Sequence, residues 1–187
     1  MNLDKVINKT VERYEKILDN YYPSFGSTGF TERNLTFNFC SCFYNIAKEN
    51  DLIVWQEVPI DNGESNKKEH FDSLIISRKE KKLYLVEAKR INSKNKIDSV
   101  ESDLKRIKNN WKNINIDEET NGYSKHAVII ADIWIPHSNE KAKKSKEYLL
   151  KQFNNKFKNA IIKEVKKKNG PLTKKERYYI LCYTEEL

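Results

Sequence analysis

The sequence predicts an α/β fold in which a central mixed sheet is flanked by helices. Three strand-like segments follow one another near the middle of the chain, and segments with helical periodicity alternate with further strands after them. The chain has 187 residues, enough for a full hydrophobic core, and no stretch rich in Pro, Gly and Ser divides it. We therefore expect one domain over residues 1–187.

Two helices are predicted before the first strand. Apolar residues from Leu3 to Tyr21 recur at helical spacing, and Pro23, with the glycines that follow it, is expected to end this segment. Thr31 can cap a second helix, which should end near Asn50. The buried side of this helix is expected to carry Leu35, Phe39, Cys42, Phe43 and Ile46.

Changes in periodicity predict the strands and the remaining helices. An antiparallel meander is expected from the runs at 52–60, 71–77 and 83–88, with a first turn at 61–63. Apolar residues from Ile97 to Ile114 then step by three or four, which predicts an amphipathic helix. The last elements are expected to be a strand at 127–135 buried on both faces, a helix with inward residues from Leu149 to Val165, and a strand at 178–183. Periodic apolar stripes place three tryptophans in the core: Trp55, Trp111 and Trp134.

The composition favours a polyanionic partner and disfavours a membrane protein. Lys and Arg number 35 against 27 Asp and Glu, and the net charge of +8 suits nucleic acid, although many lysines equally suit a solvated surface. The N-terminal residues lack an apolar signal core, and the strongest apolar run, 127–135, contains Asp132. The cysteines Cys40, Cys42 and Cys182 form no pairable framework and lack zinc-ligand spacing, so we expect reduced thiols and a cytoplasmic protein.

One acid-x-Lys triplet differs from the others in its surroundings. The four triplets are Glu80/Lys82, Glu87/Lys89, Asp103/Lys105 and Glu164/Lys166. Three of them fall in predicted helices or a turn, where charges belong on the solvent side, whereas Glu87 and Lys89 close the apolar strand 83–86. Residues two apart on a strand point the same way, so Glu87 and Lys89 are expected to share a face while Ala88 points away.

The hairpin register predicts a carboxylate opposite Glu87. If the turn centres on Lys79 and Glu80, residues whose numbers sum to 159 lie opposite each other, which pairs Asp72 with Glu87. Two opposed carboxylates are destabilising unless a cation lies between them. Hard oxygen ligands suit Mg²⁺, with Mn²⁺ as a substitute, so we expect a metal held by Asp72, Glu87 and the carbonyl of Ala88, with Lys89 beside it. The alternative is a solvated strand end at which Asp72 pairs with Lys89 and nothing binds.

These residues resemble the motif of the PD-(D/E)xK superfamily, whose fold restriction endonucleases and Holliday junction resolvases share. The matching residues are Asp72, with the apolar strand behind it, and Glu87-Ala88-Lys89, while His70-Phe71 replaces the nominal proline. The predicted order over about residues 31–135 also resembles the restriction endonuclease-like αβββαβ core. An extra N-terminal helix and a C-terminal helix and strand lie outside that core.

The resemblance implies a metal-dependent endonuclease and a further acidic residue. Many members carry a glutamate in the first core helix, and Glu32 is the match here, with Glu57 as the substitute if Glu32 faces away. Position favours phosphate contacts by Arg90, Lys94 and Lys96. DNA is the expected substrate, in restriction, repair or anti-phage work, and cutting both strands would suit a homodimer. An RNA-directed nuclease and a binding module of the same fold with weak or no cleavage are the alternatives.

Overall fold

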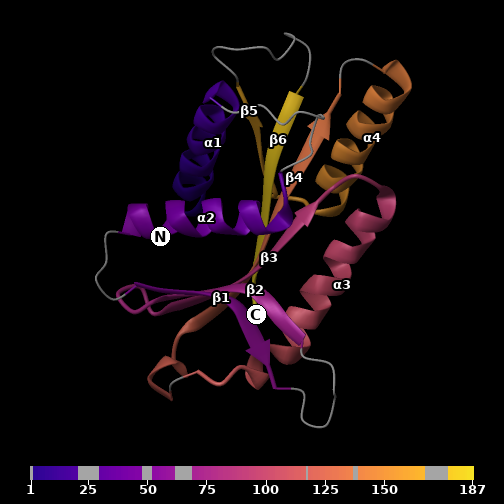
Figure 1. Cartoon of the computed structure of the whole chain (residues 1–187). Helices are drawn as coiled ribbons and strands as arrows, with labels where there is room; N and C mark the ends of the chain where they lie inside the picture. The colour runs from indigo at the N-terminus through magenta and orange to yellow at the C-terminus, as the bar shows by residue number, and fades with distance from the viewer. Residues whose placement is uncertain are drawn as a thin grey trace.

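A six-stranded mixed sheet forms the centre of the molecule (Figure 1). The computed structural model describes residues 2–20, 30–47, 52–61, 69–116, 118–136, 139–166 and 177–187. The strands are β1 (Leu52–Ile60), β2 (Glu69–Ser77), β3 (Lys82–Arg90), β4 (Ser124–Ile135), β5 (Ile161–Val165) and β6 (Arg177–Glu186). They lie in the order β1-β2-β3-β4-β6-β5, and only β3 and β4 run parallel. The predicted α/β class with a mixed sheet between helices is confirmed.

Helices cover both faces of this sheet. They are α1 (Leu3–Asn20), α2 (Glu32–Ala47), α3 (Lys94–Asn110) and α4 (Glu140–Lys156). Figure 1 shows α1 and α2 on one side of the sheet and α3 and α4 on the other. Because a helix must follow β3 before the chain can return to pair with β4 in parallel, α3 is placed beside the C-terminal half of β3.

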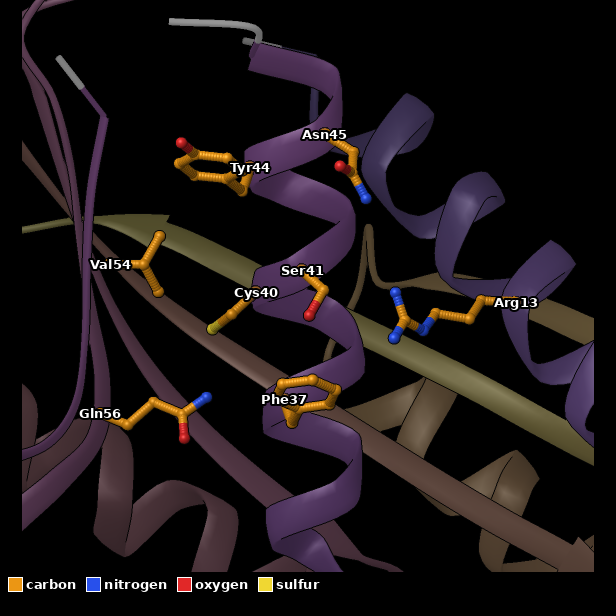
Figure 2. A pocket seen from close by; sticks show the side chains of 8 residues that line it. All are labelled: Arg13, Phe37, Cys40, Ser41, Tyr44, Asn45, Val54 and Gln56. Atoms are coloured by element: carbon orange, nitrogen blue, oxygen red, sulfur yellow. The ribbon is translucent and has the colours of Figure 1, made fainter. Parts of the chain in front are cut away.

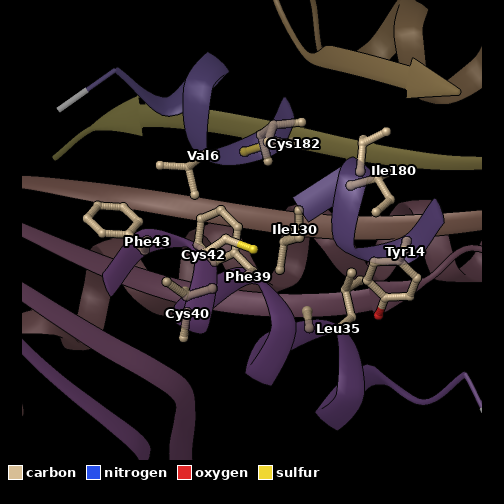
Figure 3. Close-up of a cluster of buried hydrophobic side chains, with 14 of the residues drawn as sticks. Val6, Tyr14, Leu35, Phe39, Cys40, Cys42, Phe43, Ile130, Ile180 and Cys182 are labelled. Atoms are coloured by element: carbon tan, nitrogen blue, oxygen red, sulfur yellow. The ribbon is translucent and has the colours of Figure 1, made fainter. Parts of the chain in front are cut away.

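Each face of the sheet has its own hydrophobic core. The core under α1 and α2 includes Leu35, Phe39 and Phe43 of the predicted α2 stripe, with Tyr14 of α1 beside them (Figure 3). The core under α3 and α4 contains the four buried residues of α3, Ile97, Val100, Leu104 and Ile107. Residues 127–135 of β4 are all buried, as predicted, because both faces of that strand are covered.

Several element bounds agree with the sequence-based predictions. Strand β1 has the expected bounds, and β2 and β3 extend the expected runs by two residues or fewer at each end. Thr31 caps α2, since its Oγ1 accepts a hydrogen bond from the Asn34 amide at 3.2 Å. The expected end of the first helix at Pro23, the expected end of the second near Asn50 and the turn at Asn62 and Gly63 lie outside the described residues.

The prediction of a helix reaching Val165 is wrong. Helix α4 ends at Lys156, Asn159 adopts a left-handed conformation with φ of 75°, and Ile161–Val165 forms strand β5. The spacing of Phe157, Ala160 and Ile161 fits a helix, but the β-branched residues of 161–165 pair with β6, and this long-range pairing prevails over the local pattern.

Two smaller predictions also fail. Trp55 is 53% exposed rather than in the core, because β1 is the edge strand and Trp55 points away from the α1/α2 core in which its neighbour Val54 packs. The amphipathic helix ends at Asn110 and continues as a 3₁₀ turn over Trp111–Asn113, so Ile114 packs against the core from outside the helix. Trp134 is buried, as expected.

Candidate active site

The β2–β3 hairpin has the predicted register. Residues 78–81 form its turn, and the bonded pairs run from Ser77↔Lys82 to Ser73↔Val86, so each pair sums to 159. Asp72 and Glu87 occupy the next position, where the backbone ladder has ended. The carboxylate Oδ2 of Asp72 instead accepts a hydrogen bond from the Ala88 amide at 2.7 Å. The two acidic residues are therefore neighbours at the open end of the hairpin.

A backbone distortion in β1 and β2 adjoins Asp72. The pairs Gln56↔Ser73 and Val58↔Phe71 are formed, but Glu57 and Asp72 between them are not paired, and Glu57 has a φ of 54°. The strand also changes faces here, because Val54 packs in the α1/α2 core and Val58 in the α3/α4 core. Positive φ is costly for a residue with a side chain, and such strain often lies at functional sites.

A pocket of about 480 Å³ opens at this distortion. It lies between the N-terminal turns of α2 and the end of β1, and its lining consists of Arg33, Thr36, Gln56, Glu57 and Asp72. Asp72 thus reaches a space from which a ligand could approach.

Glu87 is a buried carboxylate. The residue is 2% exposed, and its Oε1 lies 2.5 Å from Nη2 of Arg106 on α3. Arg106 also donates from Nη1 to the carbonyl of His70 at 2.9 Å. Burial, and next the charge of Asp72, raise the pKa of Glu87 to about 8 in spite of Arg106. One arginine therefore does not compensate the desolvation of this group.

Lys89 shares the α3 face with Glu87, as predicted. Its ammonium lies 2.9 Å from Oδ2 of Asp103, and both side chains are about one-seventh exposed. Burial alone would lower the pKa of Lys89, but the hydrogen bond and charge of Asp103, with help from Glu87 and Glu32, hold the pKa above its usual value. The lysine is thus kept charged beside the two carboxylates.

The alternative in which Asp72 forms an ion pair with Lys89 does not match this geometry. Within the described ranges, no lysine, arginine or histidine nitrogen lies within 4.0 Å of the Asp72 carboxylate. Burial raises the pKa of Asp72, the nearby carboxylates Glu32 and Glu57 raise it further, and the Ala88 amide and Lys89 lower it. Asp72 is therefore an incompletely compensated acidic group.

Glu32 faces the end of β3. Its Oε1 accepts a hydrogen bond from the Arg90 amide at 2.9 Å and lies 3.6 Å from the Lys96 ammonium. Glu57, the substitute candidate, is engaged by His70 at 2.6 Å and by Arg33 at 3.7 Å. Both glutamates influence the pKa of Asp72, so both lie within electrostatic range of it.

The three predicted phosphate contacts have different surroundings. Lys94 is exposed at the start of α3, whereas Lys96 forms an ion pair with Glu32. Arg90 turns inward to Asp132, with its Nε at 3.5 Å from Oδ1, and the Tyr178 hydroxyl donates to Oδ2 of the same carboxylate at 2.6 Å. Burial raises the pKa of Asp132 to about 6 although Arg90 opposes it. Arg90 therefore pairs with a buried carboxylate. Lys94 is exposed and is the residue of the three that is most accessible to a phosphate.

Two site residues were not singled out from the sequence. The sequence predicts Asp103 on the solvent side of its helix and no role for Arg106, yet in the structure they bind Lys89 and Glu87. A usable signal exists, because Asp103 lies three residues after Val100 and four before Ile107, and so falls on the buried stripe. A charge on an inward stripe indicates a buried partner.

The acidic residues can be compared with what a metal requires. Among the described residues, no group of three or more His, Cys, Asp and Glu side chains has the geometry of a metal site. Magnesium needs fewer, since it commonly takes one or two carboxylates and keeps several waters. Asp72, Glu87 and the Ala88 carbonyl offer oxygen ligands of this kind. Among the described residues Asp72 has no cationic side chain within 4.0 Å, so its charge is available to a metal ion.

Comparison with known proteins gives no relative. No family model, no curated protein and no solved structure matches the chain. No described helix is both long and apolar enough to cross a membrane. The functional argument therefore rests on the geometry of the site.

Proposed function

We propose that the chain is a magnesium-dependent endonuclease that hydrolyses phosphodiester bonds, most readily those of DNA, on a restriction endonuclease-like core. The observation that carries the proposal is the pair of Asp72 and Glu87. Glu87 is buried, and its pKa is raised to about 8. Asp72 has no lysine, arginine or histidine nitrogen within 4.0 Å among the described residues. Buried carboxylates side by side are unfavourable unless a cation joins them.

The side chains around the pair have distinct roles in this proposal. Asp72, Glu87 and the Ala88 carbonyl hold the metal, which when bound polarises a water and neutralises charge on the phosphate. Lys89, kept charged by Asp103, orients the attacking water or stabilises charge on the scissile phosphate. Arg106 favours the ionised, ligating form of Glu87, and Glu32 fixes the end of β3 through the Arg90 amide.

The setting is part of the same proposal. Three buried free cysteines suit a reducing cytoplasm, and the net charge of +8 suits a nucleic-acid partner. Cutting both strands of a duplex needs two active sites, which a homodimer would supply.

One observation favours a second function, a nucleic-acid-binding module without cleavage. Arg106 already supplies a cation to Glu87. In such a module the Arg106–Glu87 ion pair takes the place of a metal, and Asp72 and Glu87 have only a structural role.

Cleavage assays separate the two functions. The chain is incubated with plasmid, single-stranded DNA and RNA, each with Mg²⁺ and with EDTA, beside the Glu87→Gln variant. Magnesium-dependent products that disappear in EDTA and in the variant are expected. Full activity of Glu87→Gln would contradict the proposed mechanism, and the absence of products from the wild type with retained binding would leave the binding module.

A further inference from the structure

A second pocket lies on α2 beside the candidate active site. It has a volume of about 400 Å³ and lies between α1, α2 and the edge strand β1 (Figure 2). Its lining is Arg13 from α1, Phe37, Cys40, Ser41, Tyr44 and Asn45 from α2, and Val54 and Gln56 from β1. None of these residues has a role in the proposed chemistry.

The two pockets together form one groove along α2. Gln56 lines both of them, and Thr36 of the Asp72 pocket directly precedes Phe37 of the second pocket on α2. We call this feature the α2 groove. Arg33, Phe37 and Tyr44 lie on one exposed side of the helix, at spacings of four and seven residues. The eleven residue-to-residue steps from Arg33 to Tyr44 rise about 16 Å along the helix, enough for roughly five stacked nucleotides.

Two aromatic rings in the α2 groove are exposed to solvent. Phe37 is 52% exposed and Tyr44 is 56% exposed. In Figure 2 the Tyr44 ring lies on the side of α2 that faces Val54 of β1. Large exposed aromatic side chains beside a groove are typical of a binding surface.

A cation accompanies these rings. The Arg13 guanidinium lies 5.5 Å from the centre of the Phe37 ring, and within the described ranges no carboxylate lies within 4.0 Å of Arg13. At the other end, Arg33 is 89% exposed, and its one ion pair among the described residues is a long contact of 3.7 Å with Glu57. The groove thus combines aromatic faces with two arginines available to an anion.

We propose that the α2 groove binds a single-stranded segment of nucleic acid, with bases stacked on Tyr44 and Phe37 and phosphates at Arg13 and Arg33. The choice of nucleic acid rests on the proposed function, since the groove leads to Asp72. Alternating aromatic faces and positive charges are how proteins hold single strands without reading their sequence. Bases within a duplex are stacked on each other and cannot reach these rings, so the groove discriminates against intact duplex.

Binding in EDTA tests the proposal separately from cleavage. Fluorescence anisotropy is measured with an oligothymidylate of about 12 nucleotides, the equivalent oligouridylate and a blunt duplex of the same length. Tyr44→Ala is expected to weaken single-strand binding by about 5-fold to 150-fold, the range found for loss of one base stack. Tyr44→Trp should restore it, and duplex binding should not change.

Matched controls isolate the groove from a general effect of surface aromatics. Tyr148→Ala removes a tyrosine of the same exposure, 55%, from α4 on the opposite face of the sheet, and should leave binding unchanged. Arg13→Gln should lower the slope of log affinity against log salt by about 0.7, the loss of one phosphate contact, whereas Lys151→Gln on α4 should not.

The outcomes distinguish this inference from the proposed function. Equal single-strand affinity of Tyr44→Ala and wild type overturns the inference even if the wild type cleaves DNA. A loss of binding in Tyr44→Ala supports it even if no cleavage occurs. If Tyr44→Ala changes the protein from dimer to monomer in sedimentation velocity without changing oligonucleotide binding, the groove is a contact between two copies. That result would also overturn the inference of single-strand binding.

Discussion

Replacing Glu87 by glutamine should make the protein more stable at neutral pH while it abolishes cleavage. Burial, and next the charge of Asp72, raise the pKa of Glu87 from 4.5 to about 8. The folded state therefore binds a proton more tightly than the unfolded state. Stability is greatest when this group is protonated, below about pH 4.5, and falls as the pH rises towards 8.

The size of this effect follows from the shift. Each pKa unit corresponds to about 1.4 kcal/mol, and from pH 4.5 to pH 7 about 2.5 units apply, so the raised pKa of Glu87 lowers the stability at pH 7 by about 3 kcal/mol relative to acid pH. Glutamine removes that cost, but it weakens the charge-assisted bond of Arg106, worth about 1.5–3 kcal/mol. Arg106 keeps a contact with Asp103 at 3.6 Å and its bond to the His70 carbonyl. The net gain at pH 7 is thus about 1 kcal/mol, or a few degrees in melting temperature.

Thermal unfolding from pH 5 to pH 8 in EDTA measures the prediction. The melting temperature of Glu87→Gln minus that of wild type should increase steadily with pH, and the increase is more diagnostic than its value at any one pH. Glu118→Gln, which changes an exposed glutamate, is the control and should show no trend. A difference that is constant or decreases with pH would refute the reasoning that Glu87 is a strained buried acid.

Two further predictions concern Lys89 and Asp72. Lys89→Met should lower the cleavage rate by about 10²–10³-fold while calorimetric Mg²⁺ binding survives; unchanged cleavage with a lowered melting temperature would make Lys89 only structural. Because Lys89→Met also leaves Asp103 without its cation, the double variant with Asp103→Asn should regain stability but not activity, and recovery of activity would contradict the role of Lys89. Asp72→Asn keeps an acceptor for the Ala88 amide, so it should retain the fold and lose Mg²⁺ binding in calorimetry; undiminished Mg²⁺ binding would remove Asp72 from the site.

The parts of the site that the sequence predicted depend on local geometry. A four-residue turn and the two-residue period of strands determine which residues of a hairpin face each other. The residue numbers on either side of the turn are therefore enough to predict that Asp72 lies opposite Glu87. The cap at Thr31 likewise determines where α2 begins, and so brings Glu32 to the end of β3.

The missing parts depend on contacts between distant segments. The pairing of Lys89 with Asp103 requires knowing that α3 lies on the Glu87 face, and the exposure of Trp55 requires knowing that β1 is an edge strand. The positive φ of Glu57 has no sequence signal, since glycine is the residue that normally marks this conformation. The apolar spacing of β5 predicts a helix, and only its pairing with β6 makes it a strand.

The distribution of ion pairs around β3 leaves negative charge at the place where the metal is proposed to bind. Three carboxylates, Asp72, Glu87 and Asp103, lie close to two cations, Lys89 and Arg106, and both cations are committed to the latter two carboxylates. The remaining negative charge is on Asp72, at the end of the α2 groove where Glu57 is also found. A phosphate brought up to Asp72 itself without a metal would meet repulsion from Asp72 and Glu57, which Arg33 offsets only in part, whereas at the other end it meets Arg13. Under the proposed function, a nucleic-acid strand can therefore be held by the aromatic end without metal, but its phosphate can approach Asp72 only together with a divalent cation.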